Sequence, residues 1–314
     1  MTAGFNNATE FGRVALVVGG DSPERDVSIA GGKSIAEALT RMGIEHIVVD
    51  GAPALFKEIE CGEISRVFNL MHGPGGEDGS LTGALNLYKI PVTGSNVLGS
   101  ALTMDKVRSK QLWKSVGIPT TDFILTAADR DDSEEIFQAF NLPIFVKPVD
   151  QGSSLGISKV TSAGQLSDAI QLAARYSHTV MVEPGIEGRE YFAGIIGDEC
   201  LPLIAVEPAN DFYDYEAKYE SDKTIYFCPC GLPEDKEEEL QQLAQKAFHV
   251  LGANGWGRVD FILDAFGMPW FLEVNTIPGM TDHSLIPQAA AEAGTGFDRL
   301  VWRILETSIR VAQR

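Results

Sequence analysis

Residues 258–275 have the sequence RVDFILDAFGMPWFLEVN, and this segment decides the fold of the C-terminal part of the chain. Two apolar runs flank Asp264-Ala-Phe-Gly267, a sequence typical of a turn. A turn between two such runs predicts an antiparallel β-hairpin. Because side chains alternate between the two faces of a strand, we expect Arg258 and Asp260 to share one face.

The polar residues of this hairpin predict a metal site. The turn would place Asp260 almost opposite Glu273, and Asn275 shares the face of Glu273. Two carboxylates about 4 Å apart repel by roughly 4 kcal/mol at an effective dielectric constant of about 20, so a positive group is expected between them. Carboxylate and amide oxygens suit a hard cation such as Mg²⁺, which commonly brings a nucleotide phosphate with it. A solvated polar strand face is the alternative, and the motifs upstream decide between the two.

Composition and charge narrow the class of protein. The chain has 314 residues, enough for two or three domains, and its 44% hydrophobic and 22% charged residues are typical of a globular protein. A net charge of −19 argues against a nucleic-acid partner. No apolar stretch approaches the roughly 20 residues that cross a bilayer, and no secretory signal is apparent. These features predict a cytoplasmic enzyme with no membrane association, whose four cysteines are reduced.

Strands and helices alternate in the first hundred residues, which predicts a parallel sheet covered by helices. The expected strands there are residues 14–18, 46–50 and 66–70, and the expected helices are residues 26–42 and 79–88. Further on, short strands dominate, with helices expected at residues 104–113, 162–174 and 234–251 and over the apolar positions 297–305. The fold class is therefore α/β, with domains predicted at residues 1–103, 104–186 and 187–314.

A glycine- and serine-rich loop follows a lysine at a strand end and predicts a phosphate site. The loop has the sequence KPVDQGSSLG over residues 147–156, and backbone N–H groups freed by glycine suit an anion. Most loops of this kind are ordinary turns, but Lys106 and Lys218 add further cations. By contrast, Gly31-Gly32-Lys33-Ser34 lacks the first glycine of a P-loop and lies in an expected helix, so we exclude it.

Three other segments carry candidate ligand-binding residues. Glu24 and His72 follow strands of the first sheet, at the edge where open α/β sheets bind ligands. Each has a plain alternative, since Glu24 also suits the first turn of a helix and a lone histidine is more often structural. The segment from Glu183 to Glu190 leaves one strand and enters another, so its backbone could contact adenine and a carboxylate could accept ribose hydroxyls. A domain linker with surface acids is the alternative there.

Taken in order, these segments resemble the D-alanine–D-alanine ligases of the ATP-grasp superfamily. The resemblance covers nearly the whole chain and rests on GGDSPERDVS, HGPGGEDGSLTG, SALTMDKVRSKQLW, VKPVDQGSSLG, YDYEAKY, GWGRVDF and LEVNTIPGMTDHSL. It implies a three-domain ATP-grasp architecture, with an N-terminal parallel α/β domain and two α+β domains that enclose ATP. Two positions depart from many relatives, which have Lys-Trp in place of Pro184-Gly185 and Glu in place of Gln151.

The resemblance also implies a role for each matching residue. The metal ligands, for two Mg²⁺ ions with Mn²⁺ as an alternative, are expected to be Asp260, Glu273 and Asn275. The ATP-binding residues are expected to be Lys106, Lys147, Ser154, Glu183, Ile186, Glu190 and Lys218. The catalytic residues are expected to be Glu24, Ser153, Tyr219, Arg258, Gly279 and Ser284. The contacts to D-alanine are expected to be Glu24, Val27, His72, Arg258, Gly279, Ser284 and Leu285.

The activity implied is an ATP-dependent joining of two D-alanine molecules through an acyl phosphate, for peptidoglycan precursor synthesis. A D-alanine–D-lactate or D-alanine–D-serine ligase is the nearest alternative, and Tyr219 in the sequence EAKY favours an amine over a hydroxy acid as the second substrate. A catalytically silent nucleotide-binding regulator is the non-enzyme alternative, and the complete set of Arg258, Asp260, Glu273 and Asn275 speaks against it. Relatives are usually dimers, so a homodimer is expected.

Overall fold

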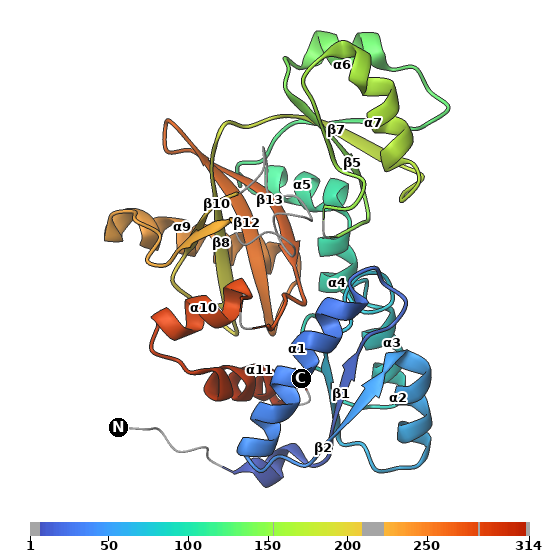
Figure 1. Ribbon diagram of the computed structural model, residues 1–314, viewed down its shortest axis with the longest axis vertical. Helices are drawn as coiled ribbons and strands as arrows, with labels where there is room; N and C mark the ends of the chain where they lie inside the picture. The colour runs from blue at the N-terminus through green and yellow to red at the C-terminus, as the bar shows by residue number, and fades with distance from the viewer. Residues whose placement is uncertain (1–6, 153, 209–222, 282, 312–314) are drawn as a thin grey trace.

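The computed structural model describes residues 7–152, 154–208, 223–281 and 283–311. Its strands form three separate sheets (Figure 1). One sheet is parallel and the other two are antiparallel, which confirms the predicted α/β class. The sheets occupy residues 14–69, 124–184 and 188–275, so each lies within one of the three predicted domain ranges.

The first sheet has the strand order β2-β1-β3, and all of its pairs are parallel. Its central strand has the sequence VALVV and is buried along its whole length, as a parallel strand with covered faces requires. The strands are β1 (Val14–Val18), β2 (His46–Asp50) and β3 (Arg66–Asn69). The other elements are a 3₁₀ turn (Ala8–Phe11), α1 (Arg25–Arg41), α2 (Gly51–Glu60), α3 (Ser80–Leu87) and α4 (Val97–Met104). The predicted strands are confirmed, whereas α2 and α4 were not predicted.

The Gly31-Gly32 pair lies inside α1, as expected, and the packing of α1 on the sheet explains why glycine occurs there. A Cβ atom added at Gly32 would lie 2.3 Å from Cγ1 of Val18, so a side chain there would push α1 away from β1. Glycine is therefore needed at position 32 so that α1 can pack closely on β1.

The second sheet has the strand order β4-β7-β5-β6 and is antiparallel throughout. Its elements are α5 (Lys106–Ser115), β4 (Ile124–Thr126), α6 (Ser133–Ala139), β5 (Ile144–Pro148), β6 (Ser158–Val160), a 3₁₀ turn (Ala163–Gln165), α7 (Leu166–Ala173) and β7 (Val180–Pro184). The expected helix over residues 104–113 begins instead at Lys106, because Asp105 is its N-cap and accepts a hydrogen bond from the Arg108 backbone N–H. The expected helix over residues 162–174 begins with a 3₁₀ turn.

The third sheet has the order β11-β10-β8-β12-β13, with β9 paired to β8, and it is antiparallel. Its elements are β8 (Gly188–Ile196), β9 (Glu199–Cys200), β10 (Ile204–Glu207), β11 (Ile225–Phe227), α9 (Glu234–Val250), β12 (Trp256–Asp264), β13 (Pro269–Asn275), α10 (Leu285–Glu292) and α11 (Phe297–Val311). Helix α9 covers one face, where Leu240, Ala244 and Phe248 are buried. Helix α10 was not predicted.

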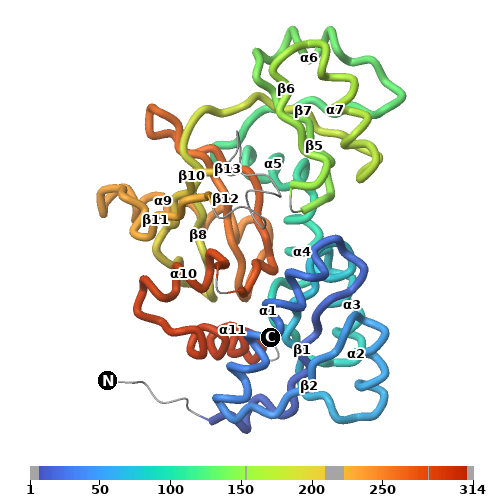
Figure 2. The backbone as a smooth tube through the Cα atoms, in the orientation of Figure 1, coloured from blue at the N-terminus to red at the C-terminus, as the bar shows by residue number. Residues whose placement is uncertain are grey.

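Helix α11 packs against α1, so the first and third predicted domains share one hydrophobic core (Figures 1 and 2). The Phe11 and Trp302 rings meet edge to face with centroids 4.8 Å apart. Buried Arg66 on β3 donates to the Ser308 hydroxyl at 2.6 Å and to the Phe11 carbonyl at 2.8 Å. The apolar stripe predicted for the final helix is confirmed, and its partner is the N-terminal domain.

Candidate active site

The hairpin of β12 and β13 has the predicted register. Asp260 is directly opposite Glu273, and Arg258 is opposite Asn275. The turn at residues 264–267 closes with a hydrogen bond from the Gly267 N–H to the Asp264 carbonyl. The pairing shifts between Asp260 and Phe261, which leaves Leu272 as an extra residue in β13.

This β-bulge was not predicted, and it shapes the site. Side chains of consecutive residues in a regular strand point to opposite faces. Leu272 and Glu273 nevertheless line the same cavity, because the bulge interrupts the alternation between them. The hairpin therefore presents an apolar and an anionic side chain side by side.

Asp260 and Glu273 each have a separate cation beside them, rather than one positive group between them as the sequence argument expected. Arg258 donates to both oxygens of Asp260, through Nε and Nη2 at 2.7 Å each. Nζ of Lys106 lies 3.3 Å from Oε2 of Glu273 and donates to the Gln151 carbonyl at 2.5 Å. Among the described residues, no group of three or more His, Cys, Asp or Glu side chains is placed to hold a metal ion. A metal at the hairpin would thus need the amide oxygen of Asn275 as its third donor.

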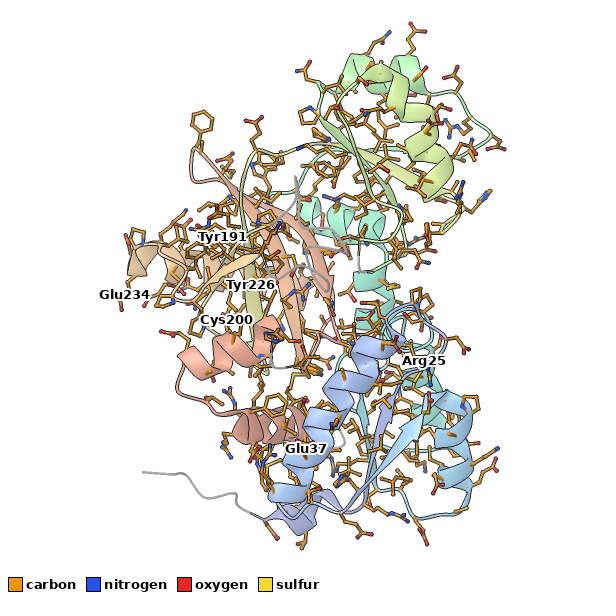
Figure 3. All side chains as sticks on the ribbon, viewed as in Figure 1. Arg25, Glu37, Tyr191, Cys200, Tyr226 and Glu234 are labelled. Carbon is orange, nitrogen blue, oxygen red and sulfur yellow. The ribbon has the colours of Figure 1, made fainter. Side chains whose placement is uncertain are left out.

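Two cavities meet at this hairpin, and Glu273 lines both of them. The first lies between the N-terminal domain and the hairpin. It brings together the predicted residues Glu24, Lys106, Arg258, Glu273, Asn275, Gly279, Ser284 and Leu285. Glu24 comes directly before α1, where Arg25 (Figure 3) donates to Asp50 at the end of β2 through both terminal guanidinium nitrogens, Nη1 and Nη2. This ion pair fixes the start of the helix and with it the position of Glu24.

Val27 and His72 are next to the first cavity, although neither lines it. Cγ1 of Val27 lies 4.0 Å from the position that a Cβ atom would take on Gly279. His72 is buried, and its Nε2 has no hydrogen-bond partner in the described part of the chain. Burial lowers the pKa of His72, and the neighbouring carboxylate of Glu24 opposes this shift. The imidazole is therefore neutral and adjacent to the site.

The second cavity lies between the second and third sheets. Its apolar wall consists of Phe145, Ile157, Pro184, Ile186, Ile262 and Leu272. Its polar wall carries the predicted residues Lys147, Ser154, Glu183, Glu190, Asp260 and Glu273. An apolar lining with a few polar groups is typical of a cofactor or nucleotide pocket. Gly185 donates to the Pro143 carbonyl at 2.8 Å, and a Cβ atom at Gly185 would meet that same oxygen at 2.8 Å, so this backbone leaves no room for a side chain there.

The Glu183 carboxylate has three partners, which the sequence did not indicate. Oε1 lies 2.5 Å from Nζ of Lys147, and Oε2 lies 2.8 Å from Nζ of Lys110. The Thr121 hydroxyl donates to Oε2 at 2.5 Å. Burial alone would raise the pKa of Glu183, but the two ammonium groups hold it well below its ordinary value. The Glu183 carboxylate is therefore already paired where it lines the cavity, and a ribose hydroxyl that bound it would share its oxygens with these partners.

Glu77 was not predicted as a site residue, although it lies in the quoted segment HGPGGEDG. It lines the first cavity, is buried, and accepts a hydrogen bond at 2.7 Å from the Gly73 N–H. Burial, followed by the charge of Glu24, raises the pKa of Glu77 to about 8. Its position between two glycine-rich turns was the available signal.

Three predicted residues lie outside the described part of the chain. They are Ser153, Lys218 and Tyr219. The rest of the predicted set lies within or beside the two cavities.

A pocket between two antiparallel sheets, with Lys147 on one sheet and a carboxylate hairpin on the other, defines the ATP-grasp class. A crystal structure of the D-alanine–D-alanine ligase from Bacillus anthracis complexed with ATP has a TM-score of 0.83 with this chain, 32% identity, and coverage of 96% of this chain and 98% of that one. The family model described as the D-ala D-ala ligase C-terminus matches residues 112–306.

Sequence relatives agree with this assignment. The D-alanine–D-alanine ligase of Methylococcus capsulatus is 46% identical over 97% of this chain and 98% of its own length. That of Dechloromonas aromatica is 48% identical over 95% of this chain and 98% of its own length. The chain belongs to the D-alanine–D-alanine ligase family.

Proposed function

We propose that the protein joins two D-alanine molecules into D-alanyl-D-alanine at the expense of ATP, for peptidoglycan precursor synthesis. The observation that carries this proposal is the shared wall of the two cavities. Glu273 lines both, so a nucleotide in the second cavity and an amino acid in the first would meet at the hairpin. The names of the full-length relatives support the same substrates.

ATP would bind in the second cavity. The apolar wall would hold adenine, with the backbone near Ile186 for its edge and Glu190 for the ribose hydroxyls. The phosphates would be held by Lys106, Lys147, Ser154 and Lys218. Lys106 borders the first cavity, so it could remain bound to the γ-phosphate as this group is transferred to the D-alanine carboxylate.

Mg²⁺, as two ions, or Mn²⁺ would be held by Asp260, Glu273 and Asn275. All three donors are hard oxygen atoms, and the strand register sets Asp260 opposite Glu273. The Arg258 fork holds Asp260 in one orientation, as outer partners of metal ligands do. Bound there, the metal would neutralise phosphate charge during phosphoryl transfer.

The chain's own residues would serve two successive steps. In the first, one D-alanine carboxylate oxygen attacks the γ-phosphorus of ATP, ADP leaves, and an acyl phosphate forms. In the second, the amine of the other D-alanine attacks the acyl carbon, and inorganic phosphate leaves after the amine has lost a proton. The tetrahedral oxyanion would be stabilised by Arg258 and the Gly279 N–H, because preorganised donors are most effective where charge develops.

The two amino acids would be held at opposite ends of the first cavity. Glu24 would bind the first D-alanine's ammonium group, with Val27 and His72 beside it. Ser284 and Leu285, at the N-terminus of α10, would bind the second carboxylate, since a helix N-terminus favours an anion. Ser153 and Tyr219 would complete a hydrogen-bonded network with Glu24.

The remaining expectations concern the setting of the enzyme. We propose the domain boundaries 1–103, 104–186 and 187–314, with α11 packed on the first domain. We also propose a cytoplasmic homodimer that uses no nucleic acid, in keeping with the net charge of −19. In the described part of the chain, every helix is too short or too polar to cross a membrane.

Product analysis tests the proposal. The purified protein is given ATP, Mg²⁺ and D-alanine, and separately D-alanine with D-serine or D-lactate, and the products are identified by mass. D-alanyl-D-alanine with equal amounts of ADP is expected. Phosphate release without a dipeptide from D-alanine alone would reject the proposal.

A variant pair then tests the hairpin. Glu273→Ala should lower turnover by a factor of at least about 100, as loss of a group that stabilises transition-state charge does. Glu207→Ala is the matched control, since it removes an exposed carboxylate from β10 of the same sheet. Equal turnover of the two variants would remove Glu273 from the metal site.

A further inference from the structure

Lys110 is a buried lysine that lies behind the second cavity, called the nucleotide cavity from here on. It lies in the middle of α5, and its side chain is 1% exposed. It does not line the cavity itself, yet it contacts Glu183, which does. A buried lysine needs compensation, because taking an ammonium group out of water is costly.

Burial lowers the pKa of Lys110, and the charge of Glu183 opposes this shift. The hydrogen bonds around Nζ favour the charged form. Its Nζ lies within hydrogen-bond distance of three oxygens: Oε2 of Glu183 at 2.8 Å, Thr120 Oγ1 at 2.8 Å and Thr121 Oγ1 at 2.9 Å. The Thr120 hydroxyl already donates to the Phe271 carbonyl at 2.7 Å, and the Thr121 hydroxyl donates to Glu183 at 2.5 Å. Both hydroxyls can therefore only accept from Lys110. Three acceptors need three N–H donors, which an ammonium group has and a neutral amine lacks.

Two ammonium groups thus share one carboxylate. Lys147 binds one oxygen of Glu183 and Lys110 binds the other, so the three side chains together carry one net positive charge. This surplus matters because the described residues that line the nucleotide cavity include one lysine and four carboxylates. Arg258 and Lys106, which line the first cavity, offset Asp260 and Glu273.

We propose that Lys110 is a positioning residue for ATP: it keeps Glu183 neutralised so that Lys147 can turn to the phosphates. Without Lys110, the charges of Lys147 and Glu183 would cancel. Lys147 could then leave only by stranding a buried carboxylate, which is strongly unfavourable. With Lys110 and Thr121 in place, Glu183 keeps a cation and a hydroxyl donor when Lys147 departs. The inference rests on the proposed function, since it takes ATP as the ligand.

A purely structural role is the competing account. The same cluster joins the second and third sheets, because Thr120 donates to the Phe271 carbonyl and the Phe271 N–H donates to the Pro119 carbonyl at 2.9 Å. Loss of Lys110 would then lower stability without a particular effect on nucleotide affinity. The two accounts differ in what a second substitution at Glu183 does, since it restores the charge balance but not the lost contacts.

The test measures ATP binding by calorimetry, with Mg²⁺ and without D-alanine, on folded variants identified by circular dichroism. Lys110→Met and Lys110→Gln are compared, because the glutamine amide keeps two N–H donors for the threonines and so preserves folding. Lys114→Met is the matched control, since Lys114 lies one turn further along α5 in an exposed ion pair with Asp122. Lys110→Met/Glu183→Gln is the charge-balanced double variant, and Glu183→Gln alone is its reference.

Each Lys110 variant should bind ATP about tenfold more weakly, while Lys114→Met stays within about twofold of wild type. The double variant should bind ATP within about threefold of Glu183→Gln, because Glu183 is itself a proposed ATP contact and the single variant sets the baseline. A folded Lys110→Gln that binds ATP within about twofold of wild type would overturn the inference, as would a Lys110→Met change that costs as much affinity in the Glu183→Gln background as in the wild-type protein. The readout needs no acceptor, so an error in the assigned amino acid leaves it unchanged. Wild-type protein that binds no ATP would overturn both this inference and the proposed function.

Discussion

Replacement of Glu77 by glutamine should make the protein more stable at alkaline pH. The structure buries this carboxyl group beside Glu24 and raises its pKa to about 8, from an ordinary value of 4.5. Between these two pH values the folded protein binds more protons than the unfolded chain, so wild-type stability falls as pH rises through this window. The pKa difference corresponds to about 5 kcal/mol. Glutamine resembles the protonated acid and has no proton to lose.

The assay is urea unfolding of wild type and Glu77→Gln at several pH values from 5 to 9, with a chelator present to exclude metal. The two proteins should be of similar stability near pH 5, and the variant should gain about 4 kcal/mol relative to wild type by pH 9. Glu60→Gln is the control, since Glu60 is an exposed carboxylate at the end of α2 in the same domain. A stability difference that does not change with pH would show that Glu77 titrates normally, and the reasoning would fail.

Three further outcomes are expected. Arg258→Lys keeps the charge but loses the two-pronged contact with Asp260, so turnover should fall by a factor of about 100 while the melting temperature changes little. Turnover within about tenfold of wild type would contradict this. Trp302→Ala should cost about 3–5 kcal/mol in urea unfolding, because it empties a buried site in the core shared by α1 and α11; a cost under about 1 kcal/mol would show that the core does not depend on it. Cys61 is exposed and should react with a thiol reagent at pH 8 before Cys200, since burial raises the pKa of Cys200 to about 12; equal rates would contradict the burial of that thiol.

The hairpin was predictable because its information is local. Alternation of side chains and a turn at residues 264–267 fix which residues face each other, and the observed pairing of Asp260 with Glu273 follows from them. The bulge at Leu272 was not predictable, because an extra residue in one strand leaves the pattern of apolar and polar residues almost unchanged. The break at Asp105 had a local signal, an acidic N-cap before a helix, that the sequence analysis did not use.

The cluster around Lys110 could not be found from the sequence. A lysine in an amphipathic helix predicts a solvated side chain, and only the distant Glu183 makes its burial possible. The raised pKa of Glu77 likewise could not be predicted, because it depends on burial and then on the charge of Glu24, which the first sheet brings near it. Residues whose role comes from a partner far along the chain carry no periodic signal of their own.

The contact of α11 with α1 has a consequence for synthesis on the ribosome. The parallel sheet and α1 are translated early, yet part of their core is covered by a helix that follows all three sheets along the chain. During translation, the apolar face around Leu39 and Phe68 must wait for α11 to emerge before it is enclosed. Until then the nascent chain exposes an apolar surface of the kind that chaperones bind, so completion of the first-made domain is coupled to translation of residues 297–311.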